Sequence, residues 1–379
     1  MKIAGVEALQ LRLSSVKDIF DGTQDVLVVR VQTDEGAVGY GEVVSSSYVA
    51  RAVIEAPRSG GGRHGLAEIL RGMDPMDGDA AWEAMYEGTS WYGRRGVAVH
   101  AMAGVDLALW DLRGRISGRP VFRMISSNAG EPLGAEPPRV KAYASLLWGD
   151  NLDETRALVS RVLDHGFRAV KFGFGPRDAT LEEDLERIRA AQDVLGPRGG
   201  DLMVDVGRRW TADEAIERIR AMEELERPPL WVEEPLPPDD LDGYAKLCET
   251  VTIPVASAET EELPNQFRLF MDAGVKVVQP DLGRVGLTQA LEIGRMAEER
   301  GVRCVPHCFG TGINTTAAIH WMAGTGRDLT EYPMRTNALC RDLARGLPDL
   351  DAGFVTPSDA PGFGLDLNSS VMEEYAYVG

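Results

Sequence analysis

The stretch WVEEP, residues 231–235, ends an apolar run with two acidic residues and a proline. A parallel strand buried on both faces is almost continuously apolar, and the polar residues that follow it lie at the carboxyl edge of the sheet. Such a stretch predicts a buried strand whose last residues, Glu233 among them, belong to a functional site. The same design recurs from residue 139 onward, and this recurrence decides the fold class.

Eight short apolar runs occupy residues 139–333, with helical patterns between them. The runs are RVKAYAS (139–145), AVKFGF (169–174), DLMVDVG (201–207), LWVEEP (230–235), IPVASAE (253–259), KVVQPD (276–281), RCVPHCF (303–309) and LTEYP (329–333). Intervening segments such as LEEDLERIRAAQDVL have apolar residues at spacings of three and four, which is the pattern of an amphipathic helix. Because parallel strands are joined by right-handed crossovers, this alternation predicts an α/β fold built on a parallel β/α barrel.

The part of the chain before the barrel has a different organisation. DVLVVRVQTDEGAVGYGEV (25–43) is typical of a hairpin that turns at DEG, and helical patterns follow near 49–56, 79–88 and 97–117. The tail after the last run shows no helix of the barrel type. The expected divisions are an N-terminal α+β domain (1–125), a barrel (126–350) and a C-terminal segment that returns to the first domain (351–379).

The composition limits the possible partners. The chain has 379 residues, of which 44% are hydrophobic and 26% charged, as in an ordinary soluble globular protein. Its formal net charge of −19 argues against a broad nucleic-acid or anionic-membrane surface, which needs clustered lysine and arginine. The N-terminal run is interrupted by Glu7, so it lacks a signal-peptide core, and no apolar run reaches the roughly 18 residues of a membrane span. We therefore expect a cytoplasmic protein with no nucleic-acid or membrane partner.

Titratable residues end the apolar runs at regular intervals. They are Lys171, Asp205, Glu233, Glu259, Asp281, His307 and Glu331. From Asp205 onward the separations are 28, 26, 22, 26 and 24 residues, which is one residue in each strand and helix unit. Because the carboxyl ends of barrel strands converge on one mouth, we expect these side chains to meet there.

Three consecutive units supply Asp205, Glu233 and Glu259, which are hard oxygen ligands. Carboxylates that share a site repel one another and raise one another's pKa unless a cation neutralises them. A Mg²⁺ ion with open positions for water or substrate fits this demand. The alternative is three separate exposed loop acids, which the common spacing disfavours.

The next two units supply Asp281 and His307. A carboxylate beside an imidazole fixes its tautomer and raises its basicity, so His307 is a candidate general base. Lys171 can pair with an anion, or act as a base if its pKa is lowered. Glu331 can hydrogen-bond a developing enediolate if it is protonated. Together with a divalent metal, these groups suit removal of a proton next to a carboxylate group.

These motifs resemble those of the enolase superfamily, and within it the mandelate racemase subgroup, along nearly the whole chain. MVDVG, WVEEP and VASAET, with Asp205, Glu233 and Glu259, look like that family's three Mg²⁺-binding motifs. QPDLGRVG and VPHCFG, with Asp281 and His307, look like its Asp/His dyad, and TEYP looks like its strand-eight acid. The resemblance implies a modified TIM barrel of the (β/α)7β type, an α+β capping domain, a Mg²⁺ cofactor and a homo-oligomer.

One departure from the family pattern bears on the reaction. The family's second strand often has Lys-x-Lys, with the second lysine as a second base, but the run here is Lys171, Phe172, Gly173. A racemase of that design needs a base on each face of the substrate, whereas elimination of water needs one base and an acid, and His307 can serve as both. We therefore predict a lyase, a Mg²⁺-dependent dehydratase that converts an aldonate or aldarate into a 2-keto-3-deoxy sugar acid. The alternatives are a racemase, epimerase or cycloisomerase on the same scaffold, and a non-catalytic sugar-acid binding protein.

Substrate contacts are expected from capping-domain loops, which in the resembled family close over the barrel mouth. The candidate loops are 16–25, 45–48 and 90–96, and the candidate residues from them are Asp21, Thr23 and Tyr48. The polar first loop favours a sugar acid over an aryl or dipeptide substrate. In DVGRRW, one of Arg208 and Arg209 is expected to reach the distal end of the substrate, the alternative being a solvated loop pair.

Overall fold

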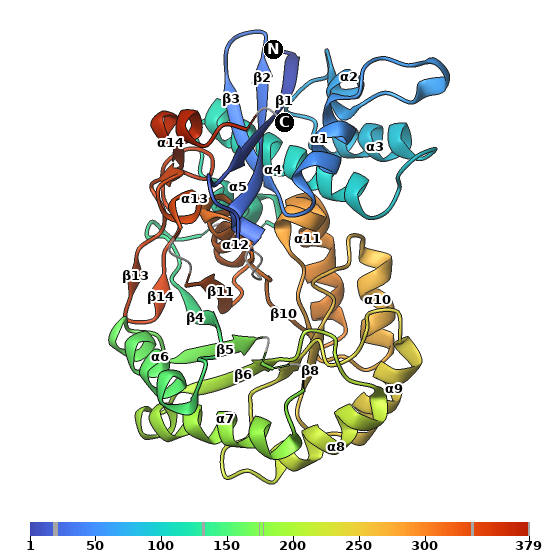
Figure 1. Ribbon diagram of the computed structural model, residues 1–379. Coiled ribbons are helices and arrows are strands. Elements are labelled where there is room, and N and C mark those ends of the chain that lie inside the picture. The colour runs from blue at the N-terminus through green and yellow to red at the C-terminus, as the bar shows by residue number, and fades with distance from the viewer. Residues whose placement is uncertain (18–21, 131–132, 174, 177, 335–336, 378–379) are drawn as a thin grey trace.

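Eight parallel strands form a barrel in the computed structural model, which describes residues 1–17, 22–130, 133–173, 175–176, 178–334 and 337–377 (Figure 1). The strands are β4 (Val140–Leu147), β5 (Ala169–Gly173), β6 (Asp201–Asp205), β7 (Val232–Glu233), β8 (Val255–Ser257), β9 (Val277–Val278), β10 (Arg303–Cys304) and β11 (Leu329–Pro333). Neighbours pair in chain order from β4 to β10, and β11 pairs in parallel with β4. The N–H of Cys308, which follows β10, donates to the Glu331 carboxylate on β11 at 2.8 Å. All eight predicted runs are therefore strands of one barrel.

Seven helices alternate with these strands in the part of the chain that is described. They are α6 (Leu152–Asp164), α7 (Leu181–Leu195), α8 (Ala212–Glu223), α9 (Leu241–Thr250), α10 (Pro264–Asp272), α11 (Leu282–Glu299) and α12 (Gly312–Gly324). Two of them begin with a capping box, in which Thr180 or Thr211 exchanges hydrogen bonds with the glutamate three residues later. Only the four-residue helix α13 (Ala338–Arg341) follows β11 directly, so the (β/α)7β prediction is confirmed.

One inward side chain from each strand unit fills the middle of the barrel. These side chains are Tyr143, Ala169, Met203, Trp231, Ala256, Val277, Val305 and Leu329. Since side chains alternate between the two faces of a strand, the residue two positions later also points inward, one layer nearer the carboxyl ends. That next layer contains Lys171, Asp205, Glu233, Gln279, His307 and Glu331. The strand pleat thus places the titratable groups directly above a packed apolar layer.

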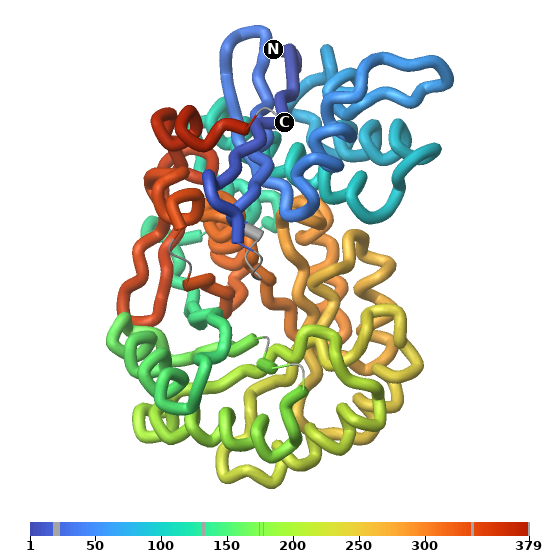
Figure 2. Tube along the Cα trace, viewed as in Figure 1, coloured from blue at the N-terminus to red at the C-terminus, as the bar shows by residue number. Residues whose placement is uncertain are grey.

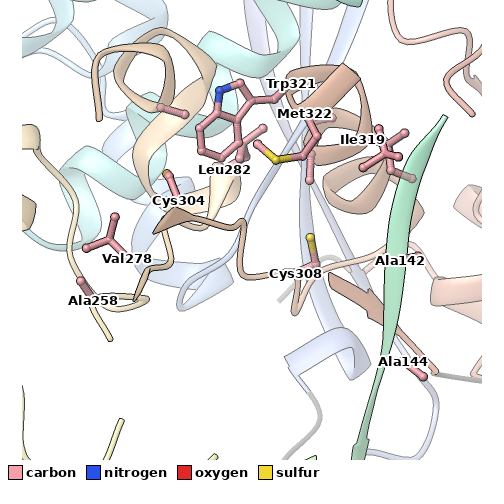
Figure 3. Packing of buried hydrophobic residues seen from close by; sticks show 14 of the residues in the cluster. Ala142, Ala144, Ala258, Val278, Leu282, Cys304, Cys308, Ile319, Trp321 and Met322 are labelled. Atoms are coloured by element: carbon pink, nitrogen blue, oxygen red, sulfur yellow. The ribbon is translucent and has the colours of Figure 1, made fainter. Parts of the chain in front are cut away.

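A larger apolar cluster lies between the strands and their helices. Figure 3 shows part of it around α12, where Ile319, Trp321 and Met322 lie among side chains of the barrel. Ile319 and Trp321 have no exposed surface. Among the described residues, no helix is long and apolar enough to span a membrane.

The N-terminal part is an antiparallel sheet covered by helices. Its strands, in the order β1-β2-β3, are β1 (Ile3–Arg12), β2 (Asp25–Thr33) and β3 (Val38–Val43), and its helices are α1 (Ser47–Glu55), α2 (Leu66–Leu70), α3 (Gly78–Thr89) and α4 (Val97–Ser117). The predicted hairpin and three of these helices are confirmed. Helix α4 is buried along most of its length because it packs against both β3 and the barrel helix α11 (Figure 2).

The C-terminal segment contacts both parts of the molecule. The short strands β13 (Leu350–Asp351) and β14 (Phe354–Val355) pair with each other, and β14 adds antiparallel to β4; β12 (Ala344–Arg345) pairs with β15 (Asp366–Leu367). After α14 (Ser369–Glu374), the backbone bonds to β1: the N–H of Arg12 donates to Tyr375 at 2.8 Å and that of Tyr377 to Gln10 at 2.9 Å. Helix α5 (Val121–Asn128) connects the two parts. The exact domain boundaries remain a prediction.

Candidate active site

The mouth of the barrel opens into a cavity of about 1040 Å³, whose wall is completed by residues of the N-terminal sheet such as Asp25 and Glu42. Five of the seven predicted titratable residues line it, namely Lys171, Asp205, Glu259, His307 and Glu331. The remaining two, Glu233 and Asp281, have no exposed surface and lie behind this wall, where each is bonded to a lining residue. The structure therefore brings the whole predicted set together.

Lys171 is buried between two carboxylates. Its Nζ donates to Oε1 of Glu233 and lies 2.9 Å from Oε1 of Glu331. Burial alone would lower the pKa of Lys171, but the two carboxylates outweigh it and raise the pKa well above its ordinary value. Of the two roles considered for Lys171, this geometry favours the anion-pairing cation over the base. Burial alone would raise the pKa of Glu331, but the charges of Lys171 and His307 outweigh it and lower the pKa. Glu331 is therefore not the protonated acid that a hydrogen bond to an enediolate would need.

His307 and Asp281 form a buried dyad. Nδ1 of His307 lies 2.7 Å from Oδ2 of Asp281, and Oδ1 of Asp281 accepts from the N–H of Gly283 at 2.8 Å and from Nδ2 of Asn314 at 2.9 Å. A proton held on Nδ1 by the carboxylate leaves Nε2, 3.4 Å from Oε2 of Glu259, as the other functional atom of the ring. Burial opposes protonation, but Glu259 and Asp281 raise the pKa of His307 to about 10.

The three predicted metal ligands lie at the ends of β6, β7 and β8. Burial, and then the charge of Glu233, raise the pKa of Asp205 well above its ordinary value. Burial also raises the pKa of Glu233, even though Lys171 opposes this. Oε2 of Glu259 is buried and accepts no hydrogen bond. These three acids therefore lie close enough to affect one another, and their negative charge is only partly compensated by the protein.

Strained backbone accompanies each of the three acids. Four non-glycine residues in the described chain have a positive φ, and three of them are Arg208 (64°), Glu234 (47°) and Ala258 (81°). They lie three positions after Asp205, one after Glu233 and one before Glu259. Left-handed non-glycine residues cost free energy and cluster at functional sites. Alternation of side chains along β8 would point residue 258 toward the cavity. The positive φ of Ala258 ends this alternation, and the side chain that lines the cavity is that of Glu259 instead.

Matches to two family models cover most of the chain. Residues 154–371 match the model described as enolase C-terminal domain-like, and residues 15–126 match the mandelate racemase / muconate lactonizing enzyme, N-terminal domain. The chain belongs to the enolase superfamily, in its mandelate racemase subgroup.

Similar members of the superfamily include more than one kind of enzyme. The arabinonate dehydratase of Saccharolobus solfataricus is 28% identical over 369 residues, covering 95% of this chain and 93% of the relative. The D-galactarolactone cycloisomerase of Agrobacterium fabrum is 31% identical over 376 residues, covering 94% and 92%. A solved structure of a racemase from Streptomyces coelicolor A3(2) with bound magnesium is 25% identical, has a TM-score of 0.84 and covers 99% of this chain and 100% of that one.

The acids of this superfamily member fit a hard divalent cation by their chemistry. Asp205, Glu233 and Glu259 supply only oxygen donors, the set that Mg²⁺ prefers, and the buried Oε2 of Glu259 accepts no hydrogen bond. Within the described residues, however, no three His, Cys, Asp or Glu side chains adopt a metal-coordinating arrangement. Glu233 accepts a hydrogen bond from Lys171 in this arrangement.

Glu233 accepts from two further hydrogen-bond donors, Trp231 and Gln279, and neither was predicted from the sequence. Trp231 Nε1 donates to Oε2 of Glu233 at 3.1 Å, and Gln279 Nε2 donates to the same oxygen at 2.7 Å. Gln279 has no exposed surface. Its position two residues after the inward Val277 was the signal that could have identified it, because His307 has the same relation to Val305.

A second missed group connects the capping domain to the dyad. Glu42, on β3, accepts hydrogen bonds from the N–H of Thr311 (2.9 Å), the hydroxyl of Thr311 (2.8 Å) and the N–H of Asn314 (3.1 Å), and thereby caps α12. The Asn314 side chain in turn donates to Asp281. Burial raises the pKa of Glu42 to about 7. Its carboxylate at the end of an apolar strand was the available signal, but its partners lie in another domain.

The two predicted substrate-binding arginines differ in position. Arg208 lines the cavity, and its Nε lies 3.6 Å from Oε2 of Glu234. The guanidinium of Arg209 donates to the Gly175 carbonyl, and Arg209 is not part of the wall. Arg208 is therefore the better placed of the two, and its contact with substrate remains a prediction.

Two of the predicted capping-loop residues, Thr23 and Tyr48, do not line the cavity. The hydroxyl of Tyr48 accepts a hydrogen bond from Arg12 at 2.6 Å, and Tyr48 is not among the lining residues. Thr23 is buried and accepts from Nδ2 of Asn337, which does line the cavity, at 2.6 Å. Asp21 lies outside the described residues. Substrate binding by these three residues remains a prediction.

Proposed function

We propose that the protein is a Mg²⁺-dependent dehydratase of an acid sugar, an aldonate or an aldarate. The observation that carries the proposal is a single base in the described wall: His307 has its dyad partner, whereas Lys171 is held as a cation between two carboxylates. The position of a second lysine is taken by Gly173, where a Cβ atom would lie 2.9 Å from Oδ2 of Asp205. One base suffices for elimination of water, and the name of the arabinonate dehydratase relative supports this reaction.

In the proposed reaction, three acids hold the metal ion and His307 transfers the proton. A divalent cation held by Asp205, Glu233 and Glu259 would supply positive charge beside the substrate carboxylate and make the C2 proton more acidic. Nε2 of His307 takes that proton while Asp281 holds the proton on Nδ1. The C3–O bond then breaks, His307 returns the proton to the leaving hydroxyl on the same face, and the resulting enol becomes the 2-keto-3-deoxy acid.

Lys171 stabilises negative charge on the substrate, and Glu259 affects the pKa of the base His307. The fixed ammonium of Lys171 places positive charge near the position where negative charge develops on the substrate. Of the carboxylates that raise the pKa of His307, Glu259 has the largest effect. A cation that neutralised Glu259 would remove one of the causes that raise the pKa of His307 and would thereby favour the free imidazole needed for a base.

The test is exchange of the C2 proton of the substrate in heavy water. His307→Asn is expected to reduce exchange by about 10²–10⁴-fold, the usual contribution of a general base, while Mg²⁺ binding is retained. His165→Asn, at an exposed position outside the site, is the matched control and should exchange like the wild type. Exchange at the wild-type rate in His307→Asn would remove the base from the proposal.

A second candidate is a cycloisomerase, which the name of the 31% identical relative favours. Its reaction also needs one base but starts from a lactone: loss of the proton next to the carboxylate expels the ring oxygen and gives a 2-keto acid without release of water. Semicarbazide detection across a library of aldonic and aldaric acids and their lactones separates the two by substrate. A semicarbazone signal from a lactone but not from its open-chain acid favours the cycloisomerase, and Mg²⁺ and ligand binding without any turnover favours a sugar-acid binding protein.

A further inference from the structure

One basic side chain of the cavity wall makes no hydrogen bond or ion pair within the part of the chain that the structure describes. Its basic residues are Lys171, Arg208 and Arg284. The first lies between two carboxylates, and the second lies near Glu234. Arg284 makes no side-chain hydrogen bond or ion pair with any residue that the structure describes, and its Nε is buried. A buried donor without an acceptor is unfavourable, so this position is suited to an acceptor that arrives with a ligand.

Arg284 lies on the dyad side of the cavity. It is in the first turn of α11, three residues after Asp281, and its backbone N–H donates to the Asp281 carbonyl at 2.9 Å. Residues three apart on a helix are neighbours on one face.

The groups around Arg284 leave its hydrogen-bond donors available. The charge of Arg284 helps to lower the pKa of Asp281, but the hydrogen bonds of this carboxylate are to Gly283, Asn314 and His307. Burial, and then the charge of Arg284, lower the pKa of the nearby His100 to about 3, so this imidazole is neutral and adds no second cation. The guanidinium of Arg284 therefore still lacks a hydrogen-bond acceptor, and an anion in the cavity would supply one.

We propose that Arg284 binds a second carboxylate, at the end of the substrate remote from the reacting carbons, and that the substrates of this site are dicarboxylic sugar acids. This inference rests on the proposed dehydratase function and narrows it from aldonates and aldarates to aldarates. A planar guanidinium binds a carboxylate through two parallel charge-assisted hydrogen bonds. An aldonate ends in a neutral hydroxymethyl group and leaves Arg284 without that partner.

The experiment compares each hexarate with the hexonate of the same configuration, using purified enzyme with Mg²⁺ and semicarbazide detection. The wild type is expected to prefer the hexarate. In Arg284→Met, the ratio of kcat/KM for hexarate over hexonate is expected to fall by about 10–100-fold, mainly through KM, as loss of a charged hydrogen bond implies. Arg284→Lys should recover part of the ratio, because it restores the charge without the planar pair of donors.

Arg295→Met is the matched control. It removes a guanidinium from the same helix at an exposed position whose partner is Glu299, so the ratio should stay at the wild-type value. Thermal unfolding of all three variants verifies that they are folded. Turnover of a hexonate but not of its hexarate by the wild type, or an unchanged ratio in folded Arg284→Met, overturns the inference and leaves the dehydratase function standing. Failure of every acid sugar to give a 2-keto product defeats the dehydratase function and the inference together.

Discussion

Asn314 is the residue whose replacement tests the geometry of the dyad most sharply. Asp281 accepts three hydrogen bonds, and Asn314→Leu removes the one from Nδ2 at 2.9 Å while those from His307 and Gly283 remain. A hydrogen bond to a charged group is worth about 1.5–3 kcal/mol. If this free energy holds Asp281 and His307 in position for proton transfer, the rate of C2 proton exchange should fall by about 10–100-fold.

The stability of the same variant should change little. Oδ1 of Asn314 is buried without a hydrogen-bond partner, so leucine removes an unsatisfied acceptor together with the donor. The backbone N–H of residue 314 still donates to Glu42. Exchange in heavy water and thermal unfolding are measured on the same preparation. Thr316→Val, which removes another unpartnered buried oxygen from α12, serves as the control.

Two results would refute this reasoning. One is exchange by Asn314→Leu within twofold of the wild-type rate. The other is an equal loss of rate in Thr316→Val, because that would mean that any change in the interior of α12 has the same effect.

Two further predictions concern the buried charges. Lys171→Met leaves Glu233 and Glu331 facing each other, so the metal-free variant should lose about 3–5 kcal/mol of unfolding free energy in urea titrations, against about 0–1 kcal/mol for Lys246→Met at an exposed ion pair. Equal losses in the two variants would contradict this. Burial raises the pKa of Glu42 to about 7 from an ordinary 4.5, so its contribution to stability is present at low pH and is lost as the pH rises through 7. The unfolding free energy of the wild type relative to Glu42→Gln should therefore fall by up to about 3 kcal/mol between pH 5 and pH 8, and a pH-independent difference would show that Glu42 does not titrate as described.

The barrel could be predicted from the sequence because its signals are local. Each of the eight apolar runs carries its own strand pattern, and the capping boxes that begin at Thr180 and Thr211 lie within a few residues of sequence. The C-terminal segment was harder. Pairing of β14 with β4 joins Val355 to Val140, and no short-range pattern encodes such a contact.

In the candidate site, too, the features with a local sequence signal could be predicted and the long-range contacts could not. The predicted metal ligands and the dyad residues could be identified from their positions, since each ends one strand, but the hydrogen bonds and ion pairs among them could not. Lys171 was predicted as a strand-end residue, whereas its place between Glu233 and Glu331 depends on which rotamers fit a closed layer. Glu42 was missed because the α12 amino end that it caps lies in a different domain. Homo-oligomer formation remains a prediction.

The central claim is that Asp205, Glu233 and Glu259 bind one divalent cation. Anomalous scattering from a crystal of the protein grown with Mn²⁺ tests it most directly. We predict one peak at about 2 Å from carboxylate oxygens of Asp205, Glu233 and Glu259. A peak elsewhere, or none, would contradict this prediction.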